Sequence, residues 1–132
     1  MKEGFDEIVT ERKMNLFREL SNDTNPLHCD ADYARDNNFQ DVLVYGMLTS
    51  SFYSKLAGVY LPGKHCILQG IEIEFKNPVF VGDSLRVKGE IIYLQEAYKQ
   101  VEIKASILNI DNKVCSKATI NTGLLVNNNY GK

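Results

Sequence analysis

The chain has 132 residues, of which 44% are hydrophobic and 24% charged, and its formal net charge is −2. These values are typical of one globular domain, and without a basic run nothing favours nucleic acid or an anionic membrane as partner. The N-terminus is charged where a signal peptide is apolar, no apolar run is long enough to span a membrane, and the three cysteines lack metal-ligand spacing. We therefore expect a single cytoplasmic domain over residues 1–132, without a metal and with a frayed tail at 127–132.

The N-terminal third predicts short elements around a rigid loop. Weak alternation over residues 5–10 indicates an edge strand, and Thr10 is a candidate cap for a helix. This helix has an apolar stripe that we expect in the core: Met14, Phe17 and Leu20. Pro26 stiffens the loop Asp23–His28 and excludes a regular helix there. Asp30 can cap a second short helix after this loop.

The longest predicted helix covers residues 46–60 and carries one charge, Lys55. We expect it to be buried on most sides because it has so few charges, and Leu61-Pro62-Gly63 ends it. Its predicted apolar face consists of five residues: Met47, Leu48, Phe52, Leu56 and Val59.

The second half of the chain alternates with a period of two, which predicts four antiparallel strands with one apolar face. The alternating segments lie near residues 71–76, 85–88, 101–107 and 114–125, and turn-forming residues separate them. The apolar face needs a covering helix, and only residues 46–60 are apolar enough. We predict an α+β fold in which a curved antiparallel sheet wraps around one long central helix.

Four motifs occur in this order: Asp23-Thr24-Asn25-Pro26-Leu27-His28, Val44-Tyr45-Gly46-Met47-Leu48, Leu61-Pro62-Gly63, and residues 75–83, FKNPVFVGD. Together they resemble the MaoC-like, R-specific enoyl-CoA hydratases, which have the hot-dog fold. The resemblance implies a homodimer that reversibly hydrates a trans-2-enoyl thioester to the (R)-3-hydroxyacyl form, without a metal or redox cofactor. It also implies that Asp23 and His28 are catalytic.

The chain departs from the family pattern at two positions. The family usually has glycine before the aspartate, where this chain has Asn22, and histidine before Gly-Met, where it has Tyr45. Asparagine tolerates left-handed backbone geometry, so we expect the loop to keep its shape. Tyr45 is bulkier and cannot be cationic, so we expect it to change the shape of the pocket.

Hydration requires a water to lose a proton, Cα to gain one, and the thioester carbonyl to be stabilised as an enolate. Asp23 and His28 beside one water could move both protons, in either assignment of base and acid. The backbone N–H of Gly46, at the positive end of the long helix, is our candidate donor to the enolate oxygen. Asn25 and Ser54 are candidates for orienting the loop. Ser54 lies about two helical turns beyond Gly46 and so faces roughly the same side, where its hydroxyl could bond to Asn25 or Asp23.

We expect the acyl pocket between the helix and the sheet, lined by five residues: Tyr45, Met47, Ser51, Leu56 and Ala57. Short to medium acyl groups are expected. The substrate could ride on coenzyme A or on an acyl carrier protein. The cations available for its phosphates are Lys64, Lys76, Arg86 and Lys88.

Two other functions remain open for a chain of this fold: an acyl thioesterase, or a non-catalytic module that binds acyl thioesters. The intact Asp23–His28 motif favours the hydratase, or a dehydratase running the same step backwards. A homodimer is also expected because an open sheet leaves edges that need covering.

Overall fold

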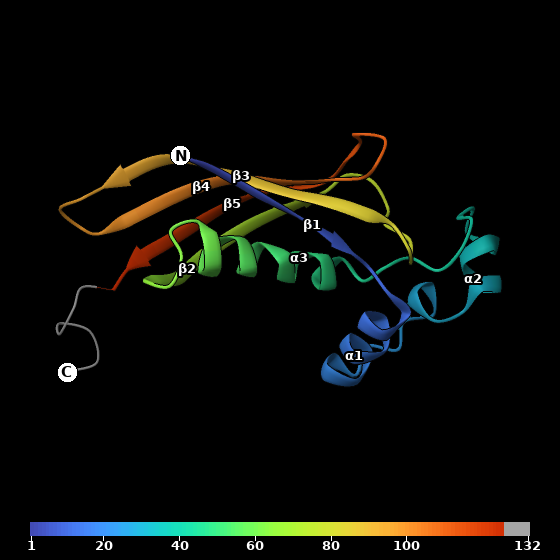
Figure 1. The fold of residues 1–132 in the computed structure, drawn as a ribbon. Helices are drawn as coiled ribbons and strands as arrows, with labels where there is room; N and C mark the ends of the chain where they lie inside the picture. Colours follow the sequence, from blue (N-terminus) through green and yellow to red (C-terminus); the bar gives the residue numbers. More distant parts are fainter. Residues whose placement is uncertain (126–132) are drawn as a thin grey trace.

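The computed structural model describes residues 1–125, which form a five-stranded antiparallel sheet with a long helical segment along one face (Figure 1). The α+β architecture predicted from the sequence is confirmed. Residues 127–132, predicted to be frayed, lie outside the described residues. The strands are β1 Lys2–Ile8, β2 Cys66–Phe75, β3 Ser84–Gln95, β4 Gln100–Leu108 and β5 Val114–Leu124.

The order of the strands is β1-β3-β4-β5-β2, so the first two strands of the chain form the two edges of the sheet. Strand β1 pairs with β3, with Phe5 opposite Val87, and β2 pairs with β5, with Ile71 opposite Ile120. The whole segment between the edge strands, residues 9–65, leaves the sheet and carries the helices (Figure 1). Every residue predicted to act in the reaction or to line the acyl pocket lies on this segment.

The helices begin where the sequence provides caps. Thr10 accepts the N–H of Lys13 at the start of α1, Glu11–Ser21, and Asp30 accepts two N–H groups at the start of α2, Ala31–Asp36. Between them lies a 3₁₀ turn, Pro26–His28. The long segment consists of α3, Gly46–Lys55, and a π-helical turn, Leu56–Tyr60.

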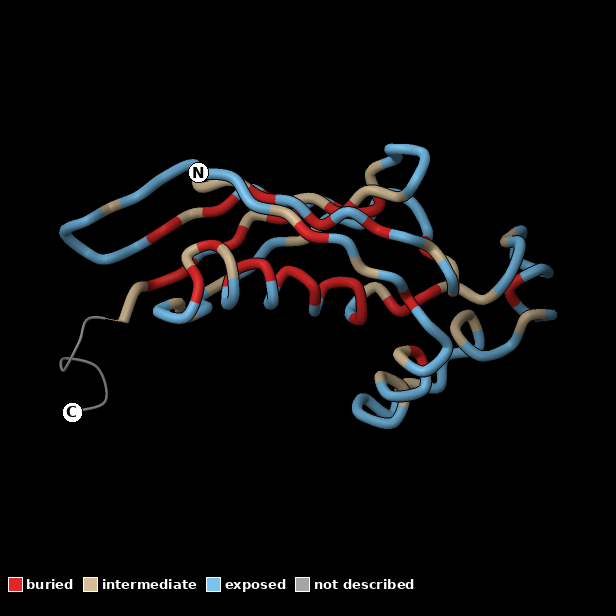
Figure 2. The backbone as a smooth tube through the Cα atoms, in the orientation of Figure 1, coloured by how far each residue is buried: buried red, intermediate tan, exposed pale blue. Residues whose placement is uncertain are grey.

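The core lies between this segment and the inner face of the sheet, where buried positions alternate with less buried ones along much of β3 and along β4 (Figure 2). Leu48, Phe52 and Leu56 point into the core. A Cβ on Gly89 of β3 would lie 2.7 Å from Cδ2 of Leu56, so glycine allows the helical segment to approach the sheet closely.

The prediction that the long helix is buried on most sides is wrong, because the sheet covers one side of it within a single chain. Met47 and Val59, assigned to the apolar face, are each 62% exposed. They belong to an exposed stripe that faces away from the sheet: Met47, Ser51, Ser54, Lys55, Gly58 and Val59. Leu20, predicted to pack with Met14, is 80% exposed because α1 covers the core only near its start.

None of the helices within residues 1–125 combines the length and the apolar character needed to cross a lipid bilayer.

Candidate active site

The loop Asp23–His28 is held in shape by hydrogen bonds within itself. A carboxylate oxygen of Asp23 accepts the N–H of Asn25 at 3.0 Å, and the side-chain oxygen of Asn25 accepts the N–H of Leu27 at 2.9 Å. Just before the loop, Asn22 has φ 56°, the left-handed geometry expected when asparagine replaces glycine. The second carboxylate oxygen of Asp23 has no hydrogen-bond partner within the described chain, so it is available to a ligand.

The imidazole of His28 is oriented by its Nδ1 atom, which lies 2.7 Å from the carbonyl oxygen of Leu43. A carbonyl can only accept a hydrogen bond, so Nδ1 carries the proton in the neutral ring and the lone pair is on Nε2. The ring also stacks on Tyr45, with centroids 4.1 Å apart. Within residues 1–125, His28 therefore has one ring nitrogen hydrogen-bonded to the protein and one without a partner, which can exchange a proton.

A cavity of about 400 Å³ brings the loop together with the start of α3. It is lined by Phe17, Ser21, Asp23, His28, Tyr45, Gly46, Met47 and Phe75. Five predicted site residues are among them. Within residues 1–125 no acceptor takes the N–H of Gly46, the first residue of α3. This donor therefore remains available beside the acid and the imidazole.

A second cavity of about 320 Å³ adjoins the first and shares His28, Gly46 and Phe75 with it. Its deep wall is buried and mostly apolar: Val44, Thr49, Val79 and Cys115. Burial raises the pKa of the Cys115 thiol, so this thiol stays protonated near neutral pH.

Sequence reasoning missed Phe75, whose ring lies where the two cavities meet. A Cβ on Gly46 would be 2.9 Å from its Cε1 atom. The only available signal was its position at the start of the FKNPVFVGD motif, which does not reveal the contact with Gly46, 29 positions earlier.

Several predicted residues lie elsewhere. Leu56 and Ala57 are 0% and 1% exposed and line neither cavity, because core side chains fill the space between helix and sheet. Ser51 is exposed and donates to the carbonyl of Leu48. Asn25 does help to hold the loop, because its side-chain oxygen accepts the N–H of Leu27 and no bond to Ser54 is involved. Ser54 is exposed and forms no hydrogen bond to the loop within the described chain.

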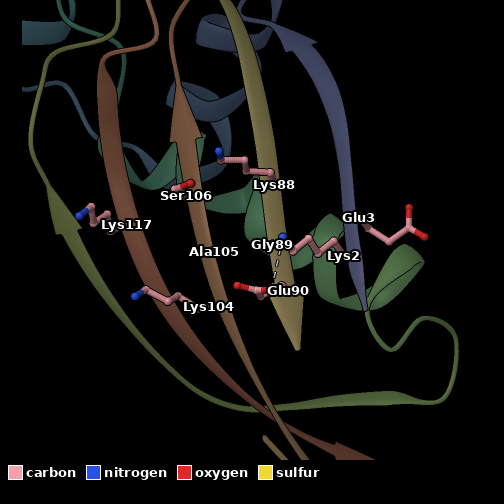
Figure 3. A pocket seen from close by; sticks show the side chains of 9 residues that line it. All are labelled: Lys2, Glu3, Lys88, Gly89, Glu90, Lys104, Ala105, Ser106 and Lys117. Carbon is pink, nitrogen blue, oxygen red and sulfur yellow. Dashed lines mark ion pairs between the residues drawn. The ribbon is translucent and has the colours of Figure 1, made fainter. Parts of the chain in front are cut away.

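A third hollow, about 290 Å³, lies on the outer face of the sheet, away from α3 (Figure 3). It contains Lys88, a candidate for binding the substrate's phosphates, together with Lys2, Lys104 and Lys117. Another candidate, Lys76, lines the second cavity and pairs with Glu74 at 2.7 Å. Of these two lysines, only Lys76 is near the loop.

Comparison with known proteins gives consistent matches. A model of the MaoC-like domain matches residues 4–112. An (R)-specific enoyl-CoA hydratase of Aeromonas caviae is 45% identical over 80 residues, which cover 61% of this chain and 60% of that protein. A mitochondrial 3-hydroxyacyl-[acyl-carrier-protein] dehydratase of Arabidopsis thaliana is 31% identical over 99 residues, or 75% of this chain and 58% of that protein. The alignments thus span about 60% of these relatives.

Among solved structures, an (R)-hydratase from A. caviae involved in PHA biosynthesis matches with a TM-score of 0.88 at 31% identity. The match covers 94% of both chains. The sheet with its central helix is therefore the hot-dog fold of the R-hydratases.

Proposed function

The chain belongs to the MaoC-like domain family, and on this premise we propose that it reversibly hydrates a trans-2-enoyl thioester to the (R)-3-hydroxyacyl thioester. The observation that carries the proposal is the cavity shared by the Asp23 carboxylate, the His28 imidazole and the Gly46 N–H. The hydratase and dehydratase names of the relatives support the same reaction.

In the proposed reaction, water binds between the free oxygen of Asp23 and Nε2 of His28. One of these groups takes a proton as the hydroxyl attacks Cβ, and a proton is delivered to Cα. The thioester carbonyl lies against Gly46, whose N–H would stabilise the enolate. Addition of water changes no oxidation state overall, so the proposal includes no redox cofactor.

We also propose that the acyl group occupies the second cavity instead of the space between helix and sheet. Its buried, mostly apolar wall favours a hydrocarbon, and its volume of about 320 Å³ suits short to medium chains. The carrier, coenzyme A or an acyl carrier protein, would then remain outside.

The deciding assay follows the loss of the enoyl absorbance of crotonyl-CoA with the purified chain. We expect the absorbance to fall without release of free thiol, and (R)-3-hydroxybutyryl-CoA to form. Release of free thiol would support the thioesterase instead. Binding without turnover of any enoyl-CoA or enoyl-carrier substrate would support the non-catalytic module.

We propose that the active form is a homodimer. The exposed stripe of the long helical segment includes Met47 of α3 and Val59 of the π-helical turn. Edge strand β2 has three exposed apolar side chains: Leu68, Ile71 and Phe75. An unpaired edge strand next to exposed apolar residues is typical of a surface that another chain covers. A second copy is the occupant that the family resemblance favours.

A charge on this stripe should separate the two copies. We expect Val59→Glu to convert a dimer into a monomer of 15.0 kDa in light scattering. Ile110→Glu is the matched control, because Ile110 is 81% exposed in the turn between β4 and β5, and it should leave the dimer intact. A wild-type chain that is monomeric at micromolar concentration and fully active would contradict the dimer.

A further inference from the structure

We propose that Arg18 and Tyr45 form a brace that fixes the Asp23–His28 loop against the start of α3. The inference rests on the proposed function, because it assigns both residues as positioning residues for that reaction. It concerns the position at which this chain has tyrosine where the family usually has histidine.

Tyr45 connects the three residues of the proposed site through its backbone, its hydroxyl and its ring. It is the residue before Gly46, and its carbonyl accepts the N–H groups of Leu48 and Thr49 in the first turn of α3. Its hydroxyl donates to the backbone carbonyl of Asp23 at 2.7 Å. Its ring stacks on the imidazole of His28 at an interplanar angle of 28°. Because Tyr45 is only 2% exposed, these contacts are protected from water.

Arg18, on α1, completes the brace from the other side. Its Nε donates to the Tyr45 hydroxyl at 3.1 Å, and its Nη2 donates to the backbone carbonyl of His28 at 3.2 Å. The guanidinium also donates to the side chain of Asn15 at 2.9 Å, which limits its rotation. One cation therefore contacts the His28 end of the loop directly and the Asp23 end through Tyr45.

The chemistry of these groups fixes the direction of each hydrogen bond. A guanidinium has only donors, so the Tyr45 oxygen accepts from Arg18 and its single proton goes to Asp23. Burial raises the pKa of the Tyr45 phenol, and the hydrogen bond to Tyr45 raises the pKa of Arg18. Both groups therefore keep their protons at physiological pH.

The brace provides what the loop's internal bonds cannot. Those bonds set the shape of the loop but not its distance from Gly46. At the His28 end, the carbonyl of Leu43 also holds the imidazole. At the Asp23 end, within the described residues, the hydrogen bond from the Tyr45 hydroxyl connects the loop to the start of α3. A shift of about 1 Å in a catalytic group can lower the rate about 100-fold.

The test compares kcat and KM for Tyr45→Phe, Arg18→Met and the double variant. Each single change is expected to lower kcat about 10- to 100-fold while KM changes less than about threefold, because the groups are misplaced but the cavity remains. The double variant should be no slower than the worse single variant, since both changes break one network. Arg18→Lys, which can still donate, should recover part of kcat.

Matched controls come from the same elements. Arg12→Met changes an exposed arginine on α1. Tyr60→Phe removes the hydroxyl of a tyrosine whose ring stacks on Phe5, at the other end of the helical segment. Both should keep wild-type kcat. The brace is overturned if Arg18→Met and Tyr45→Phe also keep wild-type kcat. This holds even if their melting temperatures are lower.

A second readout does not depend on turnover. The chain has two histidines, His28 and His65, so the imidazole NMR signals can be assigned with His65→Gln. Arg18→Met should move the His28 signals and leave those of His65 in place. Unchanged His28 signals would overturn the brace. A wild type without turnover would instead overturn the proposed function, while the NMR comparison still judges the brace.

Discussion

Replacing Asp23 by asparagine or His28 by glutamine is expected to lower kcat for enoyl-thioester hydration by about 10²- to 10⁴-fold. Each change keeps the size of the side chain but removes a group that can exchange a proton with the water. KM should change little, because the acyl cavity and Gly46 are untouched. The measurement is steady-state hydration of crotonyl-CoA, with circular dichroism to verify folding.

Two variants serve as controls for this pair. His65→Gln removes the other histidine, and Asp111→Asn changes an exposed acid in the turn between β4 and β5. Both should behave as the wild type. A fully active Asp23→Asn variant would show that the carboxylate acts only through its hydrogen bond to the N–H of Asn25, which the amide oxygen of asparagine preserves.

Gly46→Ala should lower kcat by about 10²- to 10³-fold, the range seen when an oxyanion donor is lost. The added Cβ would lie 2.9 Å from Phe75 Cε1, so either the ring or the start of α3 must move. If the start of α3 moves, the N–H of residue 46 leaves its position relative to His28, and the lower kcat follows. The measurement is kcat with the enoyl thioester, together with the melting temperature.

Gly58→Ala provides the matched control, because it lies in the π-helical turn that continues α3 and a Cβ there meets nothing within 4 Å. It should keep wild-type kcat. If Gly46→Ala matches this control, the added Cβ has displaced only the ring of Phe75 and the N–H of residue 46 has kept its place. Phe75→Leu would then tell whether the aromatic ring matters for the acyl group.

The fold was largely predictable because its signals are local. The caps Thr10 and Asp30, the period-two alternation of the strands and the low charge of residues 46–60 each depend on a few neighbouring residues. The exposure of Met47 and Val59 was not predictable, because it depends on how many layers surround the helix. Composition alone does not reveal that one face of a helix has no partner in its own chain.

The same distinction applies to the site. Asp23 and His28 lie on one short loop whose geometry Pro26 and the asparagine side chains determine, so the sequence predicts their proximity. The walls of the cavities come from residues far apart, such as Thr49, Val79 and Cys115. The volume between helix and sheet cannot be predicted from the size of single residues. The sequence therefore did not reveal that Leu56 and Ala57 line neither cavity.

The position of β1 and β2 at opposite edges of the sheet has a consequence for the order of folding. Strands β3, β4 and β5 follow one another in the chain and pair as local hairpins, whereas β1 pairs with a strand about eighty residues away. Contacts between distant residues require closure of long loops and form late. We therefore expect the hairpins to assemble first and the segment 9–65 to order last, once both of its ends have joined the sheet. Catalytic competence would then appear only at the final step of folding.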